Sequence, residues 1–277
     1  MPAIIFALFG LVIGSFLNVV ILRFGSKRSL ATGRSACPHC NAALHWYDLI
    51  PVASYVALMA KCRYCKAPIS PQYPLVETAT ACLFALVGST DMPFSLMALS
   101  LSIISILVCI FVYDLRHKLI PNLWAWLFIG FSFVFGFYES ATMGAVAMFV
   151  LYGPLAALPI LFLWYLSKLF TGESGMWMGF GDVKLALGIG YLLPWQTSLG
   201  IPLGVVAVFL AFIIGAFVSV SILIPLPHIV RFWGLRKGRA MQGYTMKSEV
   251  PFGPFLIVSC LILWFFVIYH MTIPFSL

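Results

Sequence analysis

Long apolar stretches dominate the chain and restrict how it can fold. About eight of them are separated by short polar gaps, at 3–22, 75–88, 95–113, 122–138, 144–166, 183–200, 203–226 and 252–273. A helix needs about 20 apolar residues to cross a bilayer, and the backbone inside the bilayer must hydrogen-bond within helices or closed barrels. The pattern therefore predicts an all-α polytopic membrane protein with about eight transmembrane helices. The second and sixth segments are short, and we expect them to extend into flanking residues or to cross a locally thinned bilayer.

Composition excludes an ordinary soluble domain. Of the 277 residues, 62% are hydrophobic and 9% are charged, whereas soluble domains are about 25% charged. A soluble helical protein of this composition would have too little polar surface to face water. The first apolar segment has no basic residue before it, unlike a secretory signal, so we expect a retained first helix.

The distribution of positive charge predicts the orientation. The net charge is +8, from 16 Lys and Arg against 8 Asp and Glu, a balance that in a soluble protein often indicates nucleic-acid binding. Here every Lys and Arg lies in the loops 23–74, 114–121, 167–182 and 227–251 or at the adjoining helix ends. The opposite loops, 89–94, 139–143 and the turn near 201, have none. Because cytoplasmic loops carry the excess of Lys and Arg, we expect the first set of loops in the cytoplasm and both termini outside it. We also expect lipid as a partner and no nucleic acid.

Four cysteines in the largest predicted cytoplasmic loop form two C-x2-C pairs, Cys37 with Cys40 and Cys62 with Cys65. Two such turns aim four sulfurs at one point, which is typical of a structural zinc site. Cytosolic thiols stay reduced, and metal ligation would supply folding energy to a loop with few apolar residues. A redox pair and chance are the alternatives. Four thiolates leave no open position, so we assign this zinc no catalytic step. The remaining cysteines, Cys82, Cys109 and Cys260, are expected to be buried small hydrophobes.

Two of the eight acidic residues stand at predicted membrane boundaries. Asp114 ends one apolar run, and Asp182 opens another in Gly179-Phe180-Gly181-Asp182. A carboxylate at such a depth is costly and is a functional hypothesis by default. Two carboxyl groups about 3 Å apart would share one proton, so one could activate water while the other polarises a carbonyl. Gly179 and Gly181 would let a substrate backbone approach closely.

A non-catalytic interpretation of both aspartates also fits the spacing. Asp182 could cap a helix, and Asp114 could pair with a nearby Arg or Lys. The default interpretation of four other acidic residues is a solvated surface charge, namely Asp48, Asp91, Glu139 and Glu173.

Several motifs, in order along nearly the whole chain, resemble the prepilin leader peptidases, a family of G-x-G-D membrane aspartyl proteases. They are Gly14-Ser15-Phe16-Leu17-Asn18-Val19-Val20, the two C-x2-C pairs, Ile50-Pro51-Val52, the run 68–77, Asp114 followed by Ile120-Pro121, Gly179–Lys184, and Pro251-Phe252-Gly253-Pro254.

The resemblance implies an enzyme of the bacterial inner membrane that removes the leader of type IV prepilins or type II secretion pseudopilins, with Asp114 and Asp182 as the catalytic pair. It also implies N-methylation of the new N-terminus with S-adenosylmethionine, and the alternative is a peptidase of the same fold that does not methylate. Further rivals are a proton-coupled transporter and a zinc-loop scaffold without catalysis.

We divide the chain into three parts, a first transmembrane helix, 1–22, a cytoplasmic four-cysteine loop, 23–74, and a transmembrane peptidase core, 75–277.

Three polar residues are candidate supporting residues. Asn18 and Glu77 match family motifs near the membrane boundaries, and their alternative role is hydrogen bonding between helices or helix termination. Lys184 follows Asp182 by two positions, so the two do not share a helix face. It could face another carboxylate or a phosphate, or extend toward the lipid headgroups.

Overall fold

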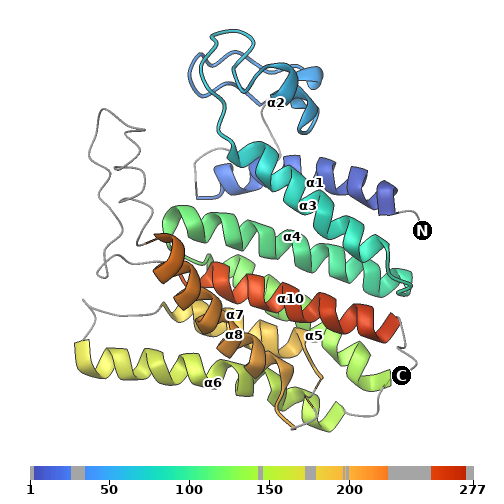
Figure 1. Ribbon diagram of the computed structural model, residues 1–277, viewed down its shortest axis with the longest axis vertical. Coiled ribbons are helices and arrows are strands. Elements are labelled where there is room, and N and C mark those ends of the chain that lie inside the picture. The colour runs from blue at the N-terminus through green and yellow to red at the C-terminus, as the bar shows by residue number, and fades with distance from the viewer. Residues whose placement is uncertain are drawn as a thin grey trace. The chain divides into compact units, whose positions relative to one another are not determined.

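The computed structural model describes residues 3–25, 35–142, 146–171, 179–195, 197, 200–223 and 251–272. Within these ranges the fold is all-α, and the only extended pairing is a pair of isolated β-bridges. Its longer helices (Figure 1) are α1 (Ala3–Arg23), α3 (Gln72–Gly88), α4 (Phe94–His117), α5 (Asn122–Thr142), α6 (Val146–Thr171), α7 (Phe180–Leu192), α8 (Leu203–Val218) and α10 (Gly253–Thr272). Short elements are η1 (Trp46–Leu49), α2 (Ala53–Ala57) and η3 (Ser219–Leu223). Glu173 and the cations of 26–34 and 231–247 lie outside the described residues.

Five helices in the described ranges are long and apolar enough to cross a membrane, and the prediction of a polytopic helical membrane protein is confirmed. They are Ala3–Arg23, Phe94–His117, Asn122–Ala141, Met148–Phe170 and Leu203–Ser221, and Gly253–Tyr269 is a shorter apolar helix. Each of the eight predicted segments coincides with a described helix. Eight crossings remain a prediction, because α3 and α7 have only 17 and 13 residues.

Several helix ends differ from the sequence-based boundaries. The predicted segment 183–200 is helical only to Leu192, because Pro194 cannot donate a helical hydrogen bond and disfavours helical geometry in the residue before it. At 1.5 Å per residue, α7 spans roughly 20 Å. Helix α4 continues past Asp114 to His117, and α5 continues to Thr142, so Glu139 lies in a helix rather than in the expected loop.

The chain forms two compact units, residues 1–112 with 268–277, and residues 113–267. In the first unit α1 and α3 lie side by side (Figure 1). Gly10 and Gly14 form a G-x-x-x-G pair that allows this approach, which is a common helix interface in membranes. A Cβ at Gly10 would lie 2.7 Å from the Cα of Ala81, and one at Gly14 would lie 2.7 Å from the Cα of Glu77.

In the second unit the short helix α7 packs against α5, α6 and α8. Most of its residues are buried, and small residues line its closest approaches. A Cβ at Gly190 would lie 2.7 Å from the Cα of Gly153 on α6, and one at Gly204 on α8 would lie 2.6 Å from the Cα of Gly190. This packing fixes the position of the helix that carries Asp182.

Replacing Gly10 by Val is expected to destabilise the protein, because the new side chain meets backbone atoms of α3 that cannot rotate away. Overpacking of this kind costs about 1–3 kcal/mol of unfolding free energy. The matched control is Gly130→Val on α5, where a Cβ has no atom within 4 Å. The melting temperature of the purified protein in detergent measures the effect, and equal melting temperatures for the two variants would contradict the proposed close α1–α3 packing.

Candidate active site

Asp114 lies one turn before the end of α4 and is only 4% exposed. The helix ends at a left-handed residue, Lys118, with φ of 53°, whose N–H donates to the carbonyl oxygen of Asp114 at 2.8 Å. Rings surround this last turn, with the centroid of Tyr113 lying 4.4 Å from that of His117 and 5.3 Å from that of Trp124. Asp114 has no ion-pair partner within the described ranges, so its pairing with Arg or Lys is not seen there.

Asp182 is 8% exposed and lies in the first turn of α7, three residues after the N-cap residue Gly179. Its backbone N–H donates to the carbonyl oxygen of Gly179 at 3.1 Å. The backbone N–H of Gly179 is directed toward the Asp182 carboxyl group, whose Oδ2 atom would lie 3.9 Å from a Cβ added at Gly179. The N-cap position that the sequence allowed for Asp182 is occupied by Gly179, and Asp182 is the third residue of α7.

The ends of α4 and α7 bring the two aspartates together, close enough that the charge of Asp114 acts on Asp182. Ile120, which is buried in the turn after α4, joins the neighbouring segments. A Cβ at Gly181 would lie 2.9 Å from the Cβ of Ile120, and one at Gly253 would lie 3.3 Å from its Cδ1 atom. Three segments distant in sequence thus meet around one buried pair of acids.

Lys184 does not face either aspartate in a salt bridge among the described residues. Its ammonium group donates to Oδ1 of Asn122 at 2.6 Å. It also lies 5.6 Å from the ring centroid of Trp126 and 5.3 Å from that of Phe180. Lys184 therefore links the start of α7 to the first residue of α5, and a contact with another carboxylate or a phosphate stays a prediction.

The four cysteines form one cluster in the first unit, and their sulfur atoms lie within 4.8 Å of one another. Each pair sits in a turn of the same design. Cys37 N–H donates to Ala42 and Asn41 N–H to Cys37, while Cys62 N–H donates to Ala67 and Lys66 N–H to Cys62. Asn41 and Lys66 both have left-handed backbones, with φ of 57° and 59°. The repeat C-x-x-C-x-A, at 37–42 and 62–67, was the sequence signal for this duplication.

The cluster fits a tetrahedral metal. A Zn–S distance of about 2.3 Å places ligand sulfurs roughly 3.8 Å apart, and the sulfurs of Cys37 and Cys65 lie 3.9 Å apart. The backbone N–H groups of Cys40 and His39 lower the pKa of the Cys37 thiol to about 6, and the N–H of Cys40 has the larger effect. Such donors stabilise the thiolate form, which is the form that binds metal.

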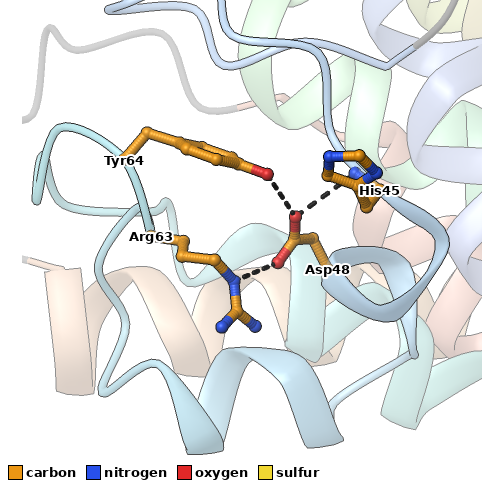
Figure 2. Close-up of polar contacts among 4 residues, drawn as sticks. All are labelled: His45, Asp48, Arg63 and Tyr64. Atoms are coloured by element: carbon orange, nitrogen blue, oxygen red, sulfur yellow. Dashed lines mark hydrogen bonds and ion pairs between the residues drawn. The ribbon is translucent and has the colours of Figure 1, made fainter.

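Asp48 fastens the second cysteine turn to η1 (Figure 2). Its carboxylate accepts from Arg63 Nε at 2.7 Å, from the Tyr64 hydroxyl at 3.2 Å and from the backbone N–H of His45 at 3.2 Å. Removal from water acts to raise the pKa of Asp48, but the bond from Arg63 and the bond from His45 hold it below its ordinary value. The side chain is 2% exposed, so the expectation of a solvated surface charge was wrong, because Arg63 and Tyr64 fold over it.

Asn18 and Glu77 make contacts between segments in the first unit. Asn18 is 1% exposed, and its amide donates to the carbonyl oxygen of Tyr73 at 3.2 Å and accepts from Gln72 at 3.3 Å. Glu77 accepts from the backbone N–H of Val52 at 2.7 Å. Val52 is a β-branched residue at φ of 58°, a conformation that needs support from its surroundings. These contacts favour the structural alternative for both residues.

Sequence reasoning missed two residues that contact the predicted site groups. Asp48 gave no signal beyond its position between the cysteine pairs. Gly253 stands beside the Asp114 carboxyl group, and the signal was available in the Pro-Phe-Gly-Pro motif, to which the sequence analysis assigned no role.

The fold and these sites define an α-helical membrane protein with a buried aspartate pair and a four-cysteine cluster. Two family models match it, the Bacterial Peptidase A24 N-terminal domain over residues 8–90 and the Type IV leader peptidase family over residues 101–220. The chain therefore belongs to the type IV leader peptidase family, and the predicted resemblance is confirmed.

Relatives named prepilin leader peptidase/N-methyltransferase support the same assignment. The protein of Aeromonas hydrophila is 31% identical over 91% of this chain and 86% of its own length. The protein of Burkholderia pseudomallei strain 1026b is 30% identical over 89% of this chain and 80% of its own length. The protein of Myxococcus xanthus is 34% identical over 72% of this chain and 58% of its own length. No solved structure matches the chain significantly.

Replacing Asp48 by Asn is expected to loosen the second cysteine turn, because one amide oxygen cannot serve three donors. Losing a hydrogen bond to a charged group costs roughly 1.5–3 kcal/mol, which would speed proteolysis of the loop at least about tenfold if cleavage requires local opening. The control is Asp91→Asn, an exposed acid between α3 and α4. Limited proteolysis measures both, and equal cleavage rates would show that the Asp48 contacts do not hold the turn.

Proposed function

We propose that this chain is a prepilin leader peptidase and N-methyltransferase that removes the leader of type IV prepilins or type II secretion pseudopilins, using Asp114 and Asp182. The observation that carries the proposal is the pair of buried carboxyl groups at the ends of α4 and α7, in a chain of the type IV leader peptidase family. Neither a scaffold nor a transporter requires two mutually repelling acids at one point.

The pair supports acid–base hydrolysis of a peptide bond. Two carboxyl groups that come within about 3 Å of each other share one proton. The ionised carboxyl takes a proton from a water molecule, whose oxygen attacks the scissile carbonyl carbon. The protonated carboxyl donates a hydrogen bond to the carbonyl oxygen and its proton reaches the leaving nitrogen as the C–N bond breaks. The products are the leader with a new carboxylate and the mature chain with a free amine.

The proposed orientation follows from the loop charges. Every Lys and Arg lies in one set of alternate loops or at the adjoining helix ends. The positive-inside rule therefore predicts that Asp114, Asp182 and the cysteine loop are on the cytoplasmic side of the inner membrane, with both termini outside. A precursor with a basic leader before an apolar helix could then enter sideways from the lipid and present its cleavage site at the depth of the aspartates. Lipid is the surrounding partner, and nucleic acid has no role.

The methyl transfer uses S-adenosylmethionine and the amine that hydrolysis exposes. The described residues outline no site that we assign to this cofactor, and we give no side chain a role in the transfer. Release of the amine within the same protein favours a following methylation. Residues 1–22, 23–74 and 75–277 are the proposed first helix, cysteine loop and peptidase core.

The proposed metal is one structural Zn²⁺ held by Cys37, Cys40, Cys62 and Cys65. When bound, it ties the two cysteine turns together, which a short loop of this composition cannot do by apolar packing alone. The four cysteines fill a tetrahedral coordination shell, so the ion has no open position for water or substrate.

Asp114→Asn and Asp182→Asn are each expected to abolish leader cleavage, because an amide can neither take a proton from water nor share one with its neighbour. Co-expression with a prepilin followed by gel mobility measures cleavage, and mass spectrometry of the mature N-terminus shows whether a methyl group is added. Asp91→Asn is the control for loss of a carboxylate elsewhere. Full cleavage by either aspartate variant would refute the catalytic pair, and an unmethylated product would leave a peptidase without methyl transfer.

The purified protein is expected to contain one zinc ion per chain, and Cys37→Ser or Cys62→Ser should lower that content sharply. Cys82→Ser, a cysteine on α3 outside the cluster, is the matched control. Elemental analysis gives the stoichiometry. A zinc content unaffected by both substitutions would exclude this site. Removal of the zinc ion by a chelator is expected to make the loop sensitive to proteases. No catalytic water should be lost with the ion, because its proposed role is structural.

A further inference from the structure

Among the described residues, the first turn of α10 leaves one backbone N–H without a hydrogen bond to another backbone group. The first four N–H groups of a helix have no partner within it. At this terminus Pro254 has no N–H, while the N–H groups of Phe255 and Leu256 both donate to the carbonyl oxygen of Phe252, at 3.0 and 3.3 Å. The N–H of Gly253 remains, and it faces the carboxyl group of Asp114.

The carboxyl group of Asp114 is also directed at Gly253. Its Oδ2 atom is buried and has no hydrogen-bond partner among the described residues. A Cβ added at Gly253 would lie 2.5 Å from this oxygen and 3.3 Å from the Asp114 Cγ atom. Real Cβ atoms do not approach other atoms so closely, so any side chain at position 253 would force a neighbouring group to move.

We infer that Gly253 is a positioning residue of the peptidase centre, which holds the carboxyl group of Asp114 in its working orientation against the start of α10. The inference rests on the proposed function of the aspartate pair. Gly253 acts through Asp114, by its small size and by its one free N–H, and has no contact of its own with the reaction.

The response to a substitution follows from which atoms would collide. At Gly10 the obstacle is the backbone of α3, whereas at Gly253 the closest atom is the end of a side chain. A carboxyl group can rotate at little cost in stability, so Gly253→Ala should leave the fold intact. The rotation would displace Oδ2 from its present position, and a displacement near 1 Å at a reacting group costs about 10²-fold in rate.

The decisive variant is Gly253→Ala, assayed as purified full-length protein with a prepilin substrate. We expect kcat to fall about a hundredfold, with KM within about twofold of wild type, because substrate binding does not require the rotated carboxyl group. Gly130→Ala is the matched control, since it adds the same methyl group to a helix where no atom lies within 4 Å. Its kcat should equal that of the wild type.

Two further readouts separate positioning from general damage. The melting temperature and the monodisperse yield of Gly253→Ala should match those of Gly130→Ala. Rates are expressed per folded molecule after size-exclusion chromatography. Methylation of a synthetic mature pilin peptide should also be unchanged, because that peptide has no leader to remove.

Each outcome decides between the two proposals. If the wild type cleaves, both aspartate variants are inactive and Gly253→Ala keeps the kcat of Gly130→Ala, the inference about Gly253 is wrong and the proposed function stands. Failure of Gly253→Ala to fold would also overturn the inference. It would mean that the added methyl group disrupts helix packing instead of rotating the Asp114 carboxyl group. If the wild type itself does not cleave prepilins, the proposed function fails first.

Discussion

The second unit is organised around two acidic side chains that are removed from water beside each other. Charged groups are expensive to bury, and two like charges at close range repel in a medium of low dielectric constant. Asp114 and Asp182 are both more than nine-tenths buried. Each has a backbone N–H directed at it, from Gly253 and from Gly179 respectively, and backbone donors can stabilise negative charge without adding a fixed cation. An amide donor leaves the pair free to exchange a proton, whereas a tightly bound Lys or Arg would favour full ionisation.

Those donors exist because both N–H groups lie at the starts of helices, that of Gly179 at the N-cap of α7 and that of Gly253 in the first residue of α10. A helix interior has no spare N–H groups, but its first turn does, so a carboxyl group at that level can be satisfied by the backbone. The short α7 places its first turn there and is held by α5, α6 and α8. Ile120 packs beside both Gly181 and Gly253, which joins the three segments. The glycines are required by these close approaches.

In the first unit, polar contacts join the four-cysteine loop to the helices. Asn18 links α1 to the start of α3, and Glu77 on α3 holds the strained turn at Val52. Asp48 then connects η1 to the second cysteine turn (Figure 2). The loop has little apolar core, so these bonds and the four sulfurs account for its folded shape. A bound zinc ion would complete it, which separates the structural task of the loop from the chemistry proposed for the aspartates.

The sequence by itself determined the membrane class, the helical segments, the cysteine cluster and the family, because hydropathy, C-x2-C spacing and G-x-G-D are local patterns. It could not decide that α7 ends at Leu192, that Asp48 is enclosed by Arg63 and Tyr64, or that Lys184 contacts Asn122. Nor could it show that Gly253 lies against Asp114, 139 positions earlier in the numbering. These features depend on contacts between distant segments, and only the packing of the helices decides which helix ends meet and which side chains are left without water.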